Sequence, residues 1–217
     1  MVSKGITFND IHSYRHLNLI LSKAEISPAP PKENIIDLPG GDGSLDLTES
    51  FGEVKYGDRA CTFTFTMNPA GDLSDSAFED KKTEVSNALN GLACNITLDK
   101  DAGFYYKGRT TVSEYLSDRR LRQIVVTAIV RPYKLKNELT EVAAALTLTA
   151  QTLVLENGRK RVVPEITCTA DAKVVFGSGT FNLSKGTHKI LEICLTEGSN
   201  EVKVSGSGMV TFRYQEG

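Results

Sequence analysis

The chain has 217 residues, 25 Lys and Arg against 27 Asp and Glu, and 40% hydrophobic residues. This length and composition are typical of a soluble globular protein with one large domain or two small ones. The formal net charge of −2 argues against strong electrostatic binding to nucleic acid or anionic lipid.

The sequence carries no sign of membrane insertion. No run approaches the roughly 18 apolar residues of a membrane span, and the start, MVSKGITFND, lacks the apolar core of a signal peptide. We therefore expect a protein that is made in a cytoplasm and is not anchored to a membrane.

The first distinctive segment is IDLPGGDGSLDLTES, residues 36–50. It is not a P-loop, because no lysine follows its glycines until Lys55. It is not an EF-hand, because Leu47 takes the position that requires glycine, and Leu45 takes a ligand position of the calcium-binding β-helix repeat. A dinucleotide fingerprint would lead into a helix, whereas this segment leads into a strand-like run. We expect a tight loop whose side chains cap its own backbone.

Most of the sequence alternates with the period of two that is typical of strands. In CTFTFTM, residues 61–67, phenylalanines and threonines occupy opposite faces. Residues 122–130 are apolar on both faces and rich in β-branched side chains, which predicts a central strand. Residues 190–214 predict three short strands with turns at 197–200 and 205–208.

One segment, residues 72–91, has a helical period instead. We expect Ser74 or Asp75 as its N-cap and Gly91 directly after its end. The apolar residues on its predicted buried face are Phe78, Val85, Ala88, Leu89 and Leu92.

Two hairpins are expected. Residues 93–112 look like two strands joined by a turn at Asp99–Gly103. Asn157 and Gly158 stand between two apolar runs, which is the strongest short signal for a hairpin.

A domain boundary is expected after Pro132, where a second series of short strands begins. We predict domains 1–136 and 137–217, the second with the strand spacing of a β-sandwich. The fold class is mainly β, with one α-helix and a hairpin in the first domain.

The four cysteines, Cys61, Cys94, Cys168 and Cys194, are far apart and form no CxxC pair, which excludes a zinc ribbon or a thioredoxin-like motif. Most lie in strand-like runs, where a thiol behaves as a small apolar group. We expect structural, unbridged thiols.

No pattern indicates an enzyme, a cofactor or a metal site. His12 and His16 share a helical spacing, but no HExxH frame surrounds them, and no GxSxG motif is present. The basic clusters 119–122 and 159–161 are expected to be solvated loop charges; alternatively they pair with a neighbouring subunit or line a pore for nucleic acid. We predict that the protein has no catalytic group.

Several motifs of the first domain are informative together through their order and spacing. The most telling is PGGDGSLDLTE, residues 39–49, and the others are GITFNDIHSYRHLNLIL (5–21), the helix, YYKGR (105–109) and IVVTAIVRPYKLK (124–136). Over residues 5–136 the chain therefore resembles distal tail proteins of long-tailed phages of Gram-positive hosts, prophages and tail-like particles.

This resemblance implies a β-sandwich-like N-terminal domain with a helix and a protruding hairpin, and a small galectin-like C-terminal β-sandwich. It implies a hexameric ring at the distal end of the tail tube, serving as baseplate hub and as a channel for DNA. The implied neighbours are the tail tube protein, the tape measure protein and the tail-associated lysin or fibre hub. The protein would be made in the host cytoplasm and reside in the virion tail, without a membrane or sequence-specific nucleic-acid contact.

A ring protein needs loops and edges that contact other copies. We expect these contacts near the hairpin 93–112 and the loop 40–48. The candidate residues are Asp42, Ser44, Asp99, Asp101, Arg109, Arg119 and Arg120.

The alternative function is a lectin-like module that binds carbohydrate in host-surface adhesion. Sugar sites usually stack a pyranose ring on an exposed aromatic side chain, most often Trp. This chain has no Trp, so the sequence does not favour that alternative.

Overall fold

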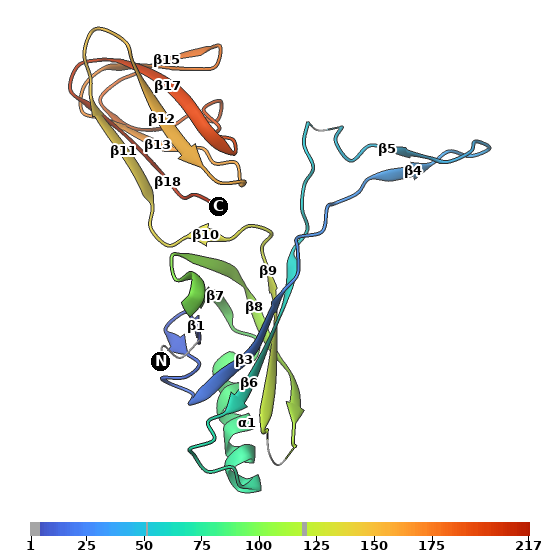
Figure 1. The fold of residues 1–217 in the computed structure, drawn as a ribbon. Coiled ribbons are helices and arrows are strands. Elements are labelled where there is room, and N and C mark those ends of the chain that lie inside the picture. The colour runs from blue at the N-terminus through green and yellow to red at the C-terminus, as the bar shows by residue number, and fades with distance from the viewer. Residues whose placement is uncertain (1–4, 51, 119–120) are drawn as a thin grey trace. The chain divides into compact units, whose positions relative to one another are not determined.

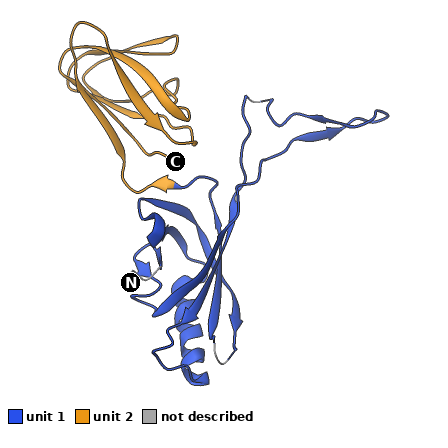
Figure 2. Cartoon of the chain, viewed as in Figure 1, with its two compact units in different colours: residues 1–134 blue, residues 135–217 orange. Residues whose placement is uncertain are grey.

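A computed structural model of the chain describes residues 5–50, 52–118 and 121–217. Its contacts divide into two compact units, residues 1–134 and 135–217, where the sequence analysis places the boundary at 136 (Figure 2). No helix in the described ranges is long and apolar enough to span a membrane.

The first unit is built on an antiparallel sheet with strand order β2-β1-β7-β8-β9-β6-β3 (Figure 1). The strands are β1 (Ile6–Phe8), β2 (Ile11–His12), β3 (Leu19–Ile26), β6 (Arg59–Met67), β7 (Ala93–Leu98), β8 (Phe104–Leu116) and β9 (Gln123–Val130). The predicted strands at 61–67 and 122–130 are thus confirmed as β6 and β9. The hairpin at 93–112 is confirmed as β7 and β8, which are joined by the 3-10 helix η1 (Asp99–Asp101) and lie within the sheet.

Aromatic packing shows that this sheet folds back on itself. Strands β1 and β6 are separated by β7, β8 and β9 in the sheet order, yet the Phe8 ring lies 6.1 Å from that of Phe63 and 6.2 Å from that of Phe65. Both pairs have edge-to-face geometry, which adds about 0.5–1.5 kcal/mol per pair beyond the burial of area. The sandwich-like character expected of this domain follows from the fold-back.

Helix α1 (Asp75–Leu89) forms where the apolar period predicts it. The Ser74 hydroxyl accepts a hydrogen bond from the Ala77 N–H at 3.2 Å, which confirms Ser74 as the N-cap. Gly91 has φ of 78°, the left-handed conformation of a residue that follows a helix. Phe78, Val85 and Leu89 are buried in the core of the unit, as the period predicts.

Between β3 and β6 the chain leaves the sheet as a long projection, residues 27–58, which we call the arm (Figure 1). Backbone hydrogen bonds hold its base together, from Lys32 N–H to Lys55 O at 2.7 Å and from Gly57 N–H to Pro30 O at 2.8 Å. Its outer part is a hairpin of β4 (Ile35–Asp37) and β5 (Ser44–Asp46). Within the segment 36–50 the expected tight loop is thus residues 38–43, which join these two strands at the tip of the arm.

The second unit is a β-sandwich, as predicted. Two antiparallel sheets, in the orders β11-β18-β13-β16 and β12-β17-β14-β15, share one apolar core that includes Leu155, Ile166, Val174 and Phe212. The strands of the unit are β10 (Leu135–Lys136), β11 (Thr140–Ala145), β12 (Gln151–Asn157), β13 (Glu165–Cys168), β14 (Ala172–Phe176), β15 (Gly179–Leu183), β16 (Gly186–Lys189), β17 (Gly198–Gly206) and β18 (Met209–Tyr214).

The hairpin predicted at Asn157–Gly158 is wrong. Strand β12 ends at Asn157 and pairs with β17, not with the residues that follow it. The buried side-chain amide of Asn157 donates to the carbonyl of Lys160 at 2.9 Å and to that of Leu195 at 3.3 Å. These bonds hold the chain after β12 in a local turn, so no second strand pairs back on it.

The first of the three strands predicted in 190–214 is also wrong, whereas the other two are β17 and β18. Ile193 and Leu195 are fully buried but Leu191 is 75% exposed, so the three do not share a face. The segment contributes only an isolated bridge between Leu195 and Val162.

All four cysteines are free, as predicted. Cys61, Cys94 and Cys168 are buried, and Cys194 is partly exposed. Burial raises the pKa of the Cys61 thiol to about 11, which keeps this group protonated and apolar.

The buried Tyr214 predicts how the second unit responds to pH. Its side chain is 3% exposed, and its hydroxyl donates to the Glu156 carbonyl at 2.6 Å. Burial, together with the nearby Glu216 and Glu156 carboxylates, raises the pKa of Tyr214 to about 12. Since a free tyrosine has a pKa of about 10, folding favours the neutral hydroxyl, and this contribution is complete below pH ~10 and lost as the pH rises through ~12.

We expect Tyr214→Phe to lower the free energy of unfolding by about 1 kcal/mol at pH 7, through the lost hydrogen bond. The difference between wild type and variant should shrink as the pH rises above about 10. Denaturant titrations followed by circular dichroism at several pH values check this. A difference that stays constant up to pH ~11.5 would contradict the assignment.

Candidate functional site

The predicted contact residues are divided between the arm and the body of the first unit. Asp42 and Ser44 lie exposed at the tip of the arm, and the Ser44 hydroxyl donates to the Asp37 carboxylate at 2.7 Å. Arg109 is exposed on β8. Arg119 and Arg120 lie outside the described residues.

The other two predicted contacts, Asp99 and Asp101, are engaged within their own unit. The Asp99 carboxylate accepts from the Gly5 N–H at 2.8 Å and lies 3.2 Å from Nε2 of His12. Asp101 accepts from the Lys134 ammonium at 2.8 Å. These bonds give both carboxylates an internal role in holding η1 against the rest of the unit.

His12 and His16 act as caps in the turn that follows β2. Nδ1 of His12 accepts from the backbone N–H groups of Tyr14 and Arg15, both at 3.1 Å, so Nε2 carries the proton and donates to Asp99. Nδ1 of His16 accepts from the His12 N–H at 3.0 Å. Within the described ranges no three metal-ligating side chains cluster.

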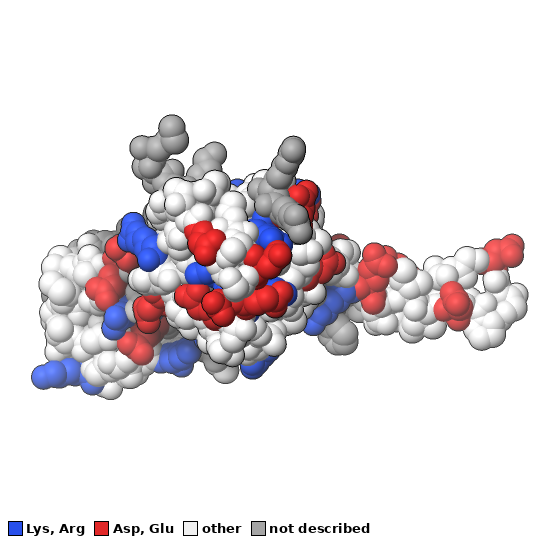
Figure 3. All heavy atoms as spheres, turned by 90° about the horizontal axis from the view of Figure 1, so that it is seen from below, with Lys and Arg blue, Asp and Glu red and all other residues white. Residues whose placement is uncertain are grey.

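The arm combines exposed apolar side chains with charge of one sign. Between Lys32 and Lys55 the sequence holds six acidic residues and no basic one. Figure 3 shows red and white spheres along the arm, with blue at its base. The large apolar side chains exposed on it are Ile35, Ile36, Leu38 and Leu45.

This composition gives the arm little stability by itself. A two-stranded hairpin is marginal in water unless a third element covers one of its faces. All six residues of β4 and β5 are exposed, so nothing in the described chain covers this hairpin. Several large apolar side chains exposed on one short hairpin are typical of a surface that another element covers.

A second surface lies on the face of β7, β8 and β9 that points away from the core. It forms an open depression of about 530 Å³. Ile129 is among the residues that line it, and this side chain is 58% exposed although it belongs to the central strand β9. The cations around it are Lys107, Arg109 and Arg131, and we call these four residues the basic patch.

A third depression, of about 500 Å³, lies on the second unit at one end of β14, β15 and β17. Lys173, Asn182 and Ser205 line it together with Leu148, which is 92% exposed. No aromatic side chain is among its lining residues, all of which the structure describes. It therefore lacks the stacking platform that most sugar sites use.

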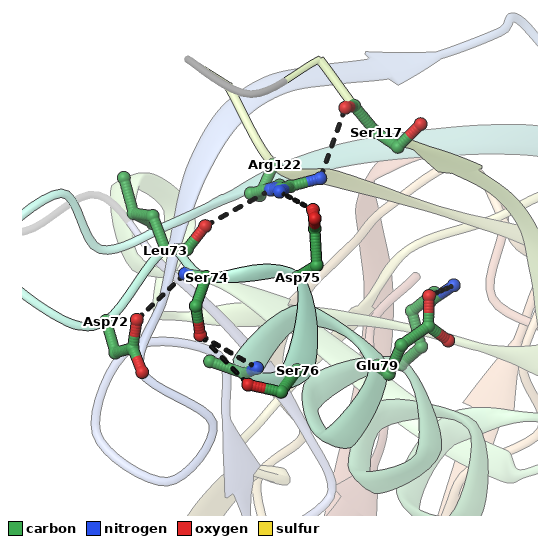
Figure 4. Close-up of polar contacts among 10 residues, drawn as sticks. Asp72, Leu73, Ser74, Asp75, Ser76, Glu79, Ser117 and Arg122 are labelled. Carbon is green, nitrogen blue, oxygen red and sulfur yellow. Dashed lines mark hydrogen bonds and ion pairs between the residues drawn. The ribbon is translucent and has the colours of Figure 1, made fainter.

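The basic run 119–122 was expected to be solvated loop charge, and this expectation is wrong for Arg122. It is only 5% exposed, and its guanidinium bonds to the carbonyls of Leu73 at 3.4 Å and Ser117 at 3.2 Å and to the carboxylate of Asp75 (Figure 4). It also lies 5.1 Å from the centre of the Phe78 ring, within the range of a cation–π contact. Arg122 thus ties the first turn of α1 to the start of β9.

Comparison with solved structures identifies the architecture. The structure matches the crystal structure of the SPP1 Dit (gp 19.1) protein with a TM-score of 0.67, and the match covers 98% of each chain. The chain has the fold of a phage Dit protein. That protein is described as a paradigm of the hub adsorption apparatus in phages that infect Gram-positive bacteria.

The two sequences are only 12% identical, so the likeness to the SPP1 Dit establishes the fold. No protein-family model matches the sequence, and no curated protein matches it either. The match confirms, for the fold, the resemblance to distal tail proteins that the motifs of residues 5–136 indicate. Because the match covers 98% of the chain, the likeness in fold also includes the second unit.

Replacing Arg122 with alanine should destabilise the first unit more than an exposed arginine in an ion pair would. The change removes three hydrogen bonds and the packing on Phe78, while Asp75, which is largely exposed, stays hydrated; we expect a loss of about 2 kcal/mol in the free energy of unfolding. Arg213, which pairs with Glu141 and is 52% exposed, is the matched control, and its replacement should cost below about 1 kcal/mol. Equal losses in a denaturant titration would contradict the structural role of Arg122.

Proposed function

We propose that this chain is a structural protein of a phage tail and forms a ring that serves as the hub at the distal end of the tail tube. The observation that carries the proposal is the match to the SPP1 Dit over 98% of both chains. The ordered motifs of residues 5–136 support it independently, because they come from sequence and not from shape.

In this proposal the ring is a hexamer with a central channel through which DNA passes. Its neighbours are the tail tube protein, the tape measure protein and the tail-associated lysin or fibre hub. The first unit forms the ring, and the second unit is a galectin-like sandwich carried on it. The protein then resides in the virion tail after synthesis in the host cytoplasm, and its role requires no catalytic group, cofactor or membrane.

The arm supports an assembly role on physical grounds. Its apolar side chains and uniform acidic charge are those of a segment that becomes stable when another chain covers it. An arm that reaches a different surface of the next copy makes a head-to-tail contact, and such contacts close into rings when the rotation permits. The tip residues Asp42 and Ser44 are therefore proposed contacts.

The purified protein should form a species of about six copies. Light scattering over a range of concentrations measures its mass, and electron microscopy shows whether the particle is an annulus. A strict monomer at all concentrations, combined with binding on a glycan array, would favour the lectin-like alternative.

Removing the outer arm should abolish the ring and leave the body folded. We expect replacement of residues 34–50 by a two-residue Asn-Gly turn to give a monomer with unchanged unfolding temperature, because the base of the arm keeps its bond between Lys32 and Lys55. Light scattering and thermal unfolding measure the two properties separately. A shortened protein that still assembles would contradict the role of the arm.

A further inference from the structure

We propose that the arm of one copy docks on the basic patch of the next copy. The acidic residues of the arm then face Lys107, Arg109 and Arg131, and its exposed leucines and isoleucines cover Ile129. This inference rests on the proposed function, since it requires neighbouring copies, and it adds the surface that receives the arm.

The basic patch is built by strand register and not by chance positions of loops. Lys107 and Arg109 are two residues apart on β8 and point to the same face. Arg109 is the direct partner of Ile129 on β9, and the Arg131 N–H donates to the Lys107 carbonyl at 2.9 Å. The register therefore places three cations beside one apolar side chain on the same face of the sheet.

The charges of the patch are largely uncompensated. Arg109 donates to the Gly91 carbonyl at 2.5 Å, which fixes its direction without neutralising it. In the part of the chain that the structure describes, neither Lys107 nor Arg131 forms an ion pair. One carboxylate, Asp58, lines the same depression. Cations held on one face of a sheet beside an exposed isoleucine favour a partner that is both acidic and apolar.

The arm has this chemistry. It carries six acidic residues and no basic one between Lys32 and Lys55, with Ile36, Leu38 and Leu45 exposed among them. Asp42 and Glu49 are exposed, and among the described residues neither side chain forms a hydrogen bond or an ion pair that holds it in place. They are free to pair with cations on another chain.

The geometry points to a second copy as the source of the arm. The arm leaves the sheet at the ends of β3 and β6, and its outer hairpin, β4 and β5, turns aside from these strands (Figure 1). The hydrogen bonds at Lys32 and Gly57 keep its two segments together at the base. The patch lies on the face of β7, β8 and β9 of that sheet, and only the root of the arm, at Asp58, reaches it.

Nucleic acid is the other polyanion that three cations could receive. The exposed Ile129 has no use in a phosphate contact, and the net charge of −2 opposes strong binding to DNA. The exposed apolar side chains of the arm, in contrast, would be partly buried by packing on Ile129. We therefore assign the patch to the arm and make DNA binding an outcome of the test.

The test exchanges charges between the two surfaces. One variant reverses the arm, with Asp42→Lys and Glu49→Lys, and the other reverses the patch, with Lys107→Glu and Arg131→Glu. Each alone places like charges in contact, so we expect assembly to need at least about tenfold more protein in light scattering. A one-to-one mixture of the two variants should assemble like the wild type, because in an alternating ring every contact is again between opposite charges.

A matched control reverses two exposed lysines on the second unit, with Lys173→Glu and Lys203→Glu. It changes the net charge by as much as the patch variant and should assemble like the wild type. Thermal unfolding of all three variants shows whether each remains folded, and restoration by mixing requires that both partners are folded.

The possible outcomes are distinct. Loss in each single variant with recovery in the mixture supports the docking. A wild type that assembles together with a patch variant that assembles equally well overturns it, while the proposed ring stands. A wild type that never assembles overturns both the docking and the proposed ring. No other result overturns the ring. A control that also dissociates, or a patch variant that keeps the ring but loses binding to a DNA oligonucleotide, overturns the docking in favour of general charge effects or of nucleic acid.

Discussion

A hairpin of two strands has no interior, so the outer part of the arm cannot bury its own apolar side chains. All residues of strands β4 and β5 are exposed, and the apolar ones among them gain little from folding in isolation. The sheet that carries the arm has no such problem, because it folds back so that Phe8 packs on Phe63 and Phe65. The packed part of the first unit therefore carries a hairpin whose apolar side chains no described residue covers.

Features with a strong local cause were predictable from the sequence. Helix α1 has an apolar face at the helical period, a serine N-cap and a glycine after its end, so three independent signals agreed on its limits. Strands β6 and β9 followed from alternation and from β-branched residues. The order of the motifs predicted the fold of a distal tail protein, and the structural match to the SPP1 Dit confirms this fold.

Features that depend on distant residues were not predictable. Asn157-Gly158 has the composition of a hairpin, but the Asn157 amide bonds to Leu195, which no local pattern reveals. Arg122 belongs to a basic run typical of loops, although its partners Leu73 and Asp75 bury it. The basic patch joins residues of β8 and β9, and only the register places Arg109 opposite Ile129. The length of the arm had no signal either, because its strands lack the alternation of a half-buried sheet.

The central claim is that the arm is stabilised by another copy of the chain. Hydrogen exchange of the backbone amides of residues 35–46, measured at protein concentrations below and above assembly, tests it most directly. The account predicts fast exchange in the monomer and at least tenfold slower exchange in the assembled particle, with little change in β6 and β9. Exchange in the arm that is equally fast in both states would contradict it.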